Sequence, residues 1–366
     1  MKRVWNLGCW QILLLVYCGN AAEACTREEL VMIQIVSRHG STSPRATYPE
    51  DPNPVSTWKE GLDDLIMLGK FQPYALGCHI RALYEDFITS DPTEVEVTSS
   101  AQPKSVKSAQ SLLASLYAPS PYWEVVQNFS WQPIHIKYDK EEDDMYLSNP
   151  ACLAADKELE RVMARESTAV FQGYKELIYF WQLNSGWELQ SIRDIDMLYD
   201  VLFKEASYNL TVPDWAKSSW NELKFCHELA SISRSKTKVL QRLRGGPLVG
   251  LTVERMKKRI ADETDQKKVA VYMTQAENIA AFLSAMGMWN FQQPGPCSTV
   301  LIELYKHEGN PFVRYLYVNS TTPEKQPQLI YPLTVPGCTE FCHLDYIIEY
   351  TKAMIPTDWK DECRII

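Results

Sequence analysis

Short apolar runs and longer amphipathic stretches alternate along the chain, and this pattern predicts its secondary structure. Residues 30–36 read Leu-Val-Met-Ile-Gln-Ile-Val, which is typical of a strand buried on both faces of a parallel sheet. Residues 94–98 alternate as Glu-Val-Glu-Val-Thr, which also favours a strand. Residues 269–273 form another short apolar run, so we expect a third strand there.

A helical pattern follows each of these strands. Residues 61–87 carry leucines at helical spacing after the first strand. Pro103 suits the first turn of a second helix, and residues 109–116 place apolar side chains on one of its faces. Residues 279–287 predict a third helix that stops at Gly287.

The rest of the chain completes an α/β pattern. Residues 300–305 and 312–318 flank Glu308-Gly-Asn, which predicts a β-hairpin, and a long middle segment is mainly helical. We therefore predict a mixed, mainly parallel sheet flanked by helices, with a smaller helical insertion. The expected division is a signal peptide (1–24), an α/β domain (25–140 and 263–366) and the helical insertion (141–262).

The first residues have the layout of a secretory signal peptide. Lys2 and Arg3 precede an apolar core at residues 10–17, and small residues follow it. The core is shorter than the ~20 residues that a membrane-spanning helix needs. We therefore expect a secreted, extracellular protein without a membrane span, whose mature form starts between Ala22 and Cys25.

Charge and export together narrow the function classes. The net charge of −9 argues against nucleic acid as a partner, because such a partner requires a basic surface. Eight of the ten cysteines lie beyond the signal segment, and an even number in an exported chain favours disulfides. None of them has Cys-x-x-Cys spacing, so no metal site is predicted.

Three Asn-x-Ser/Thr sites are expected to carry glycans: Asn128, Asn209 and Asn319.

Polar residues that could bind a ligand or take part in catalysis follow the predicted strands. Arg38 and His39 end the first strand, and Lys104 lies beyond the second. If the strands are parallel neighbours, these residues share one crevice at the carboxyl edge of the sheet. A neutral His can attack phosphorus, and an Arg can hold phosphate oxygens with its fork of donors. On the tripeptide Arg38-His39-Gly40 alone, an ordinary pair of surface residues is the simpler interpretation.

The wider sequence resembles the histidine acid phosphatases. Residues 38–44 read Arg-His-Gly-Ser-Thr-Ser-Pro and residues 48–53 read Tyr-Pro-Glu-Asp-Pro-Asn, close to the signature of that family. Residues 108–117, 279–287 and 331–338 also look like family segments. The secreted animal members, including prostatic, lysosomal and insect venom acid phosphatases, are the most similar group. The resemblance implies a phosphoglycerate-mutase-like fold, no cofactor and a phosphohistidine formed at His39.

The chain departs from this family where phosphate is handled. The resemblance places Arg38 and His39 on the first phosphate-binding Arg and the nucleophile, and Lys104 on a second Arg. Thr42 falls on another phosphate-binding Arg, and Gln275 and Ala276 fall on the family's acid-donating His-Asp pair. Thr42 and Ala276 carry no charge, and Lys104 is a point donor instead of a fork.

Two hypotheses follow from these departures. The first is a catalytically impaired or inactive pseudophosphatase that retains an anion-binding pocket. The second is an active acid phosphatase that hydrolyses phosphate monoesters through His39, with Glu277 as a substitute acid and Arg45 replacing the lost Arg. Side chains of neighbouring residues on a turn point in different directions, so we expect Glu277 and Arg45 to be poor substitutes.

The resemblance also implies disulfides and a ligand class. The implied pairs are Cys152–Cys363 and Cys338–Cys342, with Cys226–Cys297 as a weaker third pair. Cys25 and Cys78 are left over, and their pairing stays open. The expected ligand is a phosphate monoester or another small anion. The oligomeric state is open, with a homodimer as one candidate.

Overall fold

The computed structural model of the protein describes residues 29–262, 267–319 and 328–364. The predicted signal peptide and Cys25 lie outside these residues. Export therefore stays a prediction, and the pairing of Cys25 and Cys78 stays open.

Three parallel strands form the centre of a mixed sheet, as predicted. The strand order is β3-β2-β4-β1-β5-β6-β7, with β8 paired to β6. Strand β4 lies between β1 and β2 and is parallel to both. The carboxyl ends of these three strands therefore meet at one edge of the sheet. Their bounds are β1 (Glu29–Arg38), β2 (Val95–Ser99) and β4 (Val269–Thr274).

The other strands extend the sheet, mainly in antiparallel fashion. Strands β5 and β6 form the predicted hairpin, and Glu308 and Gly309 in its turn have φ values of 48° and 82°. Positive φ at both central positions is what a tight two-residue hairpin turn requires. The bounds are β3 (Ile136–Lys137), β5 (Thr299–His307), β6 (Asn310–Asn319), β7 (Leu329–Leu333) and β8 (Phe341–His343).

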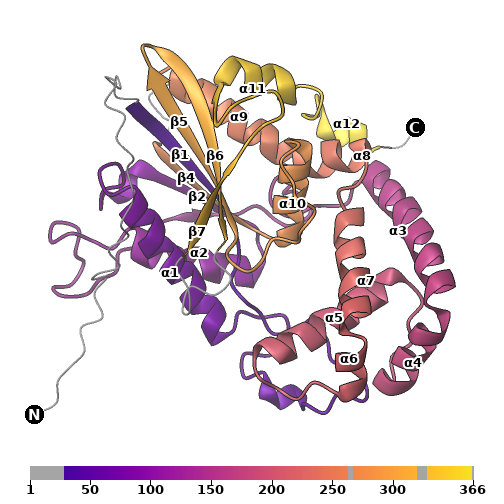
Figure 1. Ribbon diagram of the computed structural model, residues 1–366. Helices are drawn as coiled ribbons and strands as arrows, with labels where there is room; N and C mark the ends of the chain where they lie inside the picture. Colours follow the sequence, from indigo (N-terminus) through magenta and orange to yellow (C-terminus); the bar gives the residue numbers. More distant parts are fainter. Residues whose placement is uncertain (1–28, 263–266, 320–327, 365–366) are drawn as a thin grey trace, which may run out of the picture.

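Helices cover both faces of the sheet (Figure 1). Alternate residues of β1 face opposite sides, so Ile33 and Ile35 join one buried cluster and Met32 and Val36 join another. The first cluster includes α1 and α2, and the second includes α9, α10 and α11. The bounds are α1 (Met67–Leu83), α2 (Pro103–Leu116), α9 (Gly246–Ile260), α10 (Ala276–Ala285) and α11 (Leu344–Thr351).

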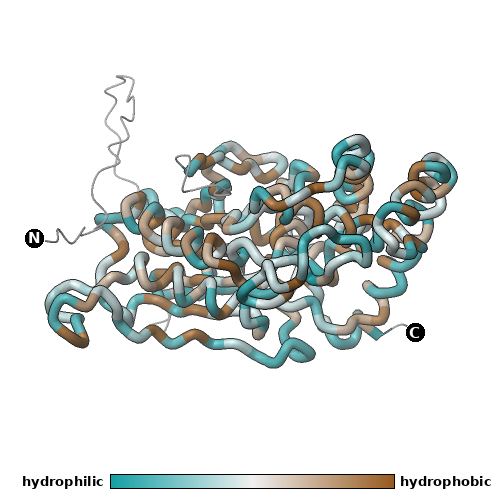
Figure 2. Tube along the Cα trace, turned by 90° about the horizontal axis from the view of Figure 1, so that it is seen from below, coloured by the Kyte–Doolittle hydropathy of each residue, from teal (hydrophilic) through white to brown (hydrophobic). Residues whose placement is uncertain are grey.

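A separate group of helices has its own buried cluster, which includes Trp181, Leu198 and Leu223. These helices lie beside the sheet in Figure 1, and hydrophobic and hydrophilic residues alternate along the helices in Figure 2. The bounds are α3 (Leu153–Gly173), α4 (Lys175–Ser185), α5 (Ile192–Ser207), α6 (Asp214–Ser218) and α7 (Trp220–Ser233). Short elements complete the chain: η1 (Val55–Thr57), η2 (Pro92–Glu94), α8 (Lys238–Leu240), η3 (Gln241–Gly245) and α12 (Trp359–Cys363).

Helix α9 lies within the range predicted for the insertion, residues 141–262, yet its Leu248 and Val253 belong to the sheet cluster. The division into an α/β domain and an insertion stays a proposal, and α9 is better counted with the sheet.

Two of the predicted disulfides are present and the third is not. Cys152 pairs with Cys363, and Cys338 pairs with Cys342. The predicted pair Cys226–Cys297 is wrong, because both cysteines are buried and unpaired. Cys226 is buried in the cluster of the separate helices, whereas Cys297 is buried in a cluster of the sheet, so the two thiols lie in different cores.

The described residues add three further observations. Within residues 29–262, 267–319 and 328–364, no helix is long and apolar enough to cross a membrane. The same residues contain no group of three or more His, Cys, Asp and Glu side chains placed to hold a metal ion. The side chains of the three sequon asparagines, Asn128, Asn209 and Asn319, are exposed.

Candidate active site

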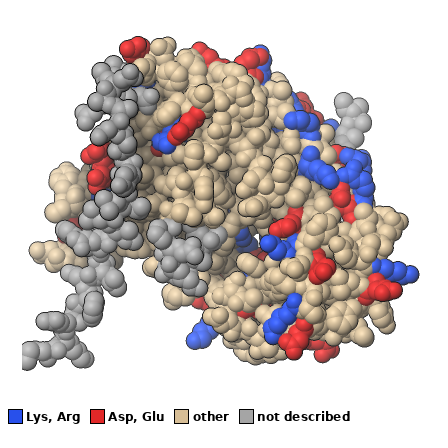
Figure 3. All heavy atoms as spheres, viewed as in Figure 1, with Lys and Arg blue, Asp and Glu red and all other residues tan. Residues whose placement is uncertain are grey.

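A cleft opens between the sheet and the separate helices, next to the ends of β1 and β4. Figure 3 shows basic side chains around this hollow. Gln275 is the N-cap residue of α10 and is not among the lining residues, although its neighbour Ala276 is. The lining includes Arg38, His39, Thr42, Arg45, Asp63, Lys104, Asp196, Asp200, Lys204, His227, Arg234, Ala276 and Glu277.

The loop that carries His39 is held by backbone contacts on several sides. The amide of His39 donates to the carbonyl of Thr274 at 3.1 Å, which ties the loop to the end of β4. The amide of Gly40 donates to Ser108 Oγ on α2 at 3.1 Å. A Cβ on Gly40 would lie 1.9 Å from the carbonyl oxygen of Gly69, so only glycine allows α1 to approach this closely.

The ring of His39 is hydrogen-bonded through one of its two nitrogens, and its pKa is lowered. Its Nδ1 lies 2.7 Å from the carbonyl oxygen of Gly40, which can only accept a hydrogen bond. Nδ1 therefore carries the proton, and Nε2 keeps its lone pair for attack. Burial lowers the pKa of His39 well below its usual 6.5, and the charges of Arg38 and Lys104 lower it further. The lowered pKa favours the neutral form of the ring.

Arg38 presents its guanidinium to the same cleft. One terminal nitrogen donates to the carbonyl of Pro294 at 2.6 Å. The buried Nε has no hydrogen-bond partner among the described residues. Burial lowers the pKa of Arg38, while nearby carboxylates, first among them Glu277, raise it. Arg38 thus retains donors that can bind an anion.

Thr42 and Ala276 also line the cleft, and both are buried. Thr42 pairs with Leu65 in an isolated antiparallel bridge, so its backbone is fixed. Neither side chain carries a charge or an acidic proton. At these two positions the cleft therefore lacks both a guanidinium and a carboxyl group.

Glu277 and Arg45, which we expected to be poor substitutes for the lost acid and the lost Arg, both line the cleft. Helix α10 begins at Ala276, three residues earlier than predicted, and this places Glu277 in its first turn. Burial would raise the pKa of Glu277, but Arg234, Arg45 and Arg38 together lower it to about 2. The Glu277 carboxylate is therefore ionised throughout the range in which acid phosphatases are assayed.

Residues of the separate helices form the opposite wall, and sequence reasoning missed them. Asp196 accepts from His227 Nδ1 at 2.6 Å and from Arg234 at 2.6 Å. On the same helix, Lys204 donates to Asp200 at 2.7 Å. The spacing of four residues from 196 to 200 to 204 is visible in the sequence and could have marked one polar helix face.

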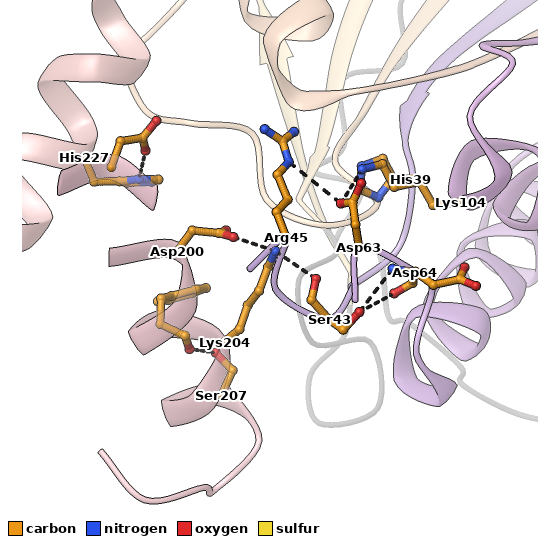
Figure 4. A network of polar contacts seen from close by, with 12 residues as sticks. His39, Ser43, Arg45, Asp63, Asp64, Lys104, Asp200, Lys204, Ser207 and His227 are labelled. Atoms are coloured by element: carbon orange, nitrogen blue, oxygen red, sulfur yellow. Dashed lines mark hydrogen bonds and ion pairs between the residues drawn. The ribbon is translucent and has the colours of Figure 1, made fainter. Parts of the chain in front are cut away.

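Charges in the cleft are largely paired with one another. In the described lining, five cations (Arg38, Arg45, Lys104, Lys204 and Arg234) face four carboxylates (Asp63, Asp196, Asp200 and Glu277). Figure 4 shows Asp63 between Arg45 and Lys104, with His227 and Asp200 across the cleft. Lys204 also donates to the carbonyl of Ser43 at 3.2 Å, which links the two walls.

Residues 29–318 match the histidine phosphatase superfamily (branch 2). The chain belongs to this family. Prostatic acid phosphatase from Bos taurus is 31% identical over 375 residues, covering 100% of this chain and 95% of that relative. Lysosomal acid phosphatase from Xenopus laevis is 28% identical, with coverages of 96% and 83%.

A solved phytase structure has the same fold as this chain. The phytase of Hafnia alvei in complex with tartrate superposes with a TM-score of 0.70 and is 15% identical. The match covers 94% of this chain and 100% of the phytase chain. At this identity the likeness shows the fold alone, so the chemistry of this histidine phosphatase family member has to be argued from its own residues.

Proposed function

We propose that this protein is a secreted member of the histidine acid phosphatases in which catalysis is impaired and an anion-binding pocket is retained. The ligand is a phosphate monoester or another small anion, and no cofactor is required. Disulfides favour an oxidising compartment, which supports export. Exposed asparagines at positions 128, 209 and 319 are consistent with glycosylation.

The observation that carries this proposal is that the two cleft residues at the start of α10, Ala276 and Glu277, offer no proton to a leaving group. Ala276 cannot donate a proton, and the pKa of Glu277 is about 2. At pH 5 about one Glu277 carboxyl in a thousand carries a proton. Loss of a general acid typically lowers the rate by about 100- to 10,000-fold.

The phosphate-binding side of the pocket is weakened as well. Thr42 supplies no charge, and Lys104 is bonded to Asp63 at 2.7 Å. Loss of one preorganised donor typically lowers the rate by about 100- to 1,000-fold. Arg38, His39 and the remaining cations still line one cleft, so an anion can bind there without efficient turnover.

An active acid phosphatase is the second candidate. Its support is the geometry of His39, whose Nε2 is available for attack, and the presence of Arg45 in the cleft. In this case His39 would form the phosphohistidine and Arg38, Arg45 and Lys104 would hold phosphate. A water molecule or Glu277 would then protonate the leaving group.

Restoring the family's residues tests the proposal. Thr42→Arg, Gln275→His and Ala276→Asp are introduced together, and turnover of an aryl and an alkyl phosphate is measured at pH 5. We expect the triple variant to exceed the wild type by about 1,000-fold or more, and each single variant to gain far less, because these residues act as a unit. His39→Ala in the triple variant is the control and should abolish the gain.

The two substrates separate the causes of impairment. An aryl leaving group needs little protonation, so loss of the acid alone would spare aryl phosphates. Loss of the phosphate-binding Arg lowers the rate for both substrates. If the triple variant gains nothing on either substrate while remaining folded, the assigned positions are wrong.

A further inference from the structure

A short segment, residues 61–65, lies against the loop that follows His39. The amide of Asp63 donates to the carbonyl of Pro44 at 2.9 Å, and the amide of Ser43 donates to the carbonyl of Asp64 at 3.0 Å. Thr42 and Leu65 form a bridge at the end of this contact. These bonds hold the side chain of Asp63 at a fixed place in the wall of the cleft.

One carboxylate oxygen of Asp63 contacts two cations of the cleft. Oδ1 accepts from Lys104 Nζ at 2.7 Å and lies 3.8 Å from Arg45 Nε (Figure 4). The side chain of Lys104 is only 5% exposed, whereas that of Asp63 is 46% exposed. A buried ammonium group requires an anionic partner, and Asp63 is the partner that Lys104 has.

The backbone at Asp63 has a φ of 55°, in the left-handed region. Glycine adopts this conformation freely, whereas an aspartate pays a small conformational cost there. The chain nevertheless places a carboxylate at this position. Its contact with Lys104 offsets that cost.

We infer that Asp63 acts as an internal anion, holding Lys104 and Arg45 and thereby lowering the affinity of the cleft for phosphate. This inference rests on the proposed anion-binding function of the cleft. Lys104 has three donor hydrogens and could in principle contact both groups. A phosphate bound to Lys104 would nevertheless lie next to the negative charge of Asp63, so the two anions compete.

Phosphate displaces Asp63 from Lys104 without any covalent step. A phosphate oxygen takes the place of Asp63 Oδ1 at Lys104 Nζ, and the freed carboxylate turns toward solvent, where half of its side chain already lies. Because Asp63 and Arg45 are both well exposed, solvent screens their mutual attraction. The bond to the buried Lys104 is therefore the main contact that phosphate has to displace.

The test measures binding of inorganic phosphate to the purified chain at pH 5 by titration calorimetry. Asp63→Gly and Asp63→Asn both remove the charge. Because glycine suits the backbone conformation at this position, Asp63→Gly keeps the test valid if the Asn variant misfolds. Asp64→Asn is the matched control, because Asp64 pairs with Lys107 and neither residue lines the cleft. We expect phosphate to bind about 10-fold more tightly to both Asp63 variants, and within about 2-fold of wild type to Asp64→Asn.

Thermal unfolding with and without phosphate gives a second readout. Phosphate should raise the unfolding temperature of Asp63→Gly more than that of the wild type, since tighter binding stabilises the folded state more. A finding that phosphate binds equally tightly to the wild type and to Asp63→Gly, while Arg38→Gln weakens phosphate binding in both backgrounds, would refute the inferred role of Asp63. This result would still support an anion-binding pocket. If neither protein binds phosphate, the inference and the proposed function fail together.

Discussion

The two walls of the cleft differ in how their charges are held. On the strand-end wall, Arg38 keeps an unpartnered buried Nε and His39 keeps a free Nε2. On the helical wall, Arg234 is bonded to Asp196 and Lys204 is bonded to Asp200. The strand-end wall therefore retains groups that can bind and attack a ligand, whereas the helical wall satisfies its charges internally.

The groups that could bind an anion and the groups that could protonate a leaving group come from different elements of the fold. His39 and Arg38 come from the end of one parallel strand, where open α/β sheets place their ligands. The acid would have to come from the start of α10, where Ala276 and an ionised Glu277 lie. A pocket can thus remain while the proton donor is missing.

The disulfide between Cys152 and Cys363 fastens the beginning of α3 to the C-terminal α12, and its removal should have the largest effect on stability. It spans 211 residues, so replacing both cysteines by Ala is expected to cost about 5 kcal/mol in the chain-entropy account. Replacing Cys338 and Cys342, which are 4 residues apart, should cost about 2 kcal/mol. Denaturant unfolding compares the two variants, and equal losses would contradict the expectation that the longer loop matters more.

Anion binding by the two walls can be compared directly with one variant from each. Arg38→Gln should weaken phosphate binding by about 10- to 100-fold, because it removes charge-assisted hydrogen bonds. Arg234→Gln should change binding by less than about 3-fold, because its guanidinium is already bonded to Asp196 at 2.6 Å. Calorimetry with inorganic phosphate measures both. A similar loss in the two variants would mean that the helical wall binds the ligand too.

The smallest expected effect concerns Glu277 and pH. Its pKa is lowered from 4.5 to about 2 in the folded protein, so its ionised form stabilises the fold above pH 4.5. This contribution, about 1 to 2 kcal/mol for a partly exposed group, should be lost as the pH falls from 4.5 toward 2. The difference in free energy of unfolding between wild type and Glu277→Gln should therefore shrink over this range. A constant difference would show that the arginines do not hold this carboxylate ionised.

The strand-end wall could be predicted because buried strands leave a strong local signal. Apolar runs end at Arg38-His39 and at Thr274, and parallel pairing brings these ends together. The direction of Glu277 could not be predicted, since it depends on where α10 begins. The helical wall was missed because a polar face on a helix has the same sequence pattern whether it borders solvent or a cleft.

The cysteines show a similar limit. The pairs Cys152–Cys363 and Cys338–Cys342 followed from the family resemblance, and the structure contains both. The weaker pair Cys226–Cys297 also came from the resemblance, and spacing along the chain cannot show that these two thiols lie in different cores. Tertiary proximity is decided by packing between distant segments.

Turnover of an aryl phosphate by the unmodified protein tests the central claim most directly. The wild type and His39→Ala are compared at pH 5 with substrate in excess. Because Ala276 and an ionised Glu277 stand at the start of α10 and Thr42 carries no charge, we predict a rate at least about 100-fold below the ~1 to 1,000 per second of ordinary enzymes. A wild-type rate within that range, abolished by His39→Ala, would contradict the account and show that this cleft is a working acid phosphatase.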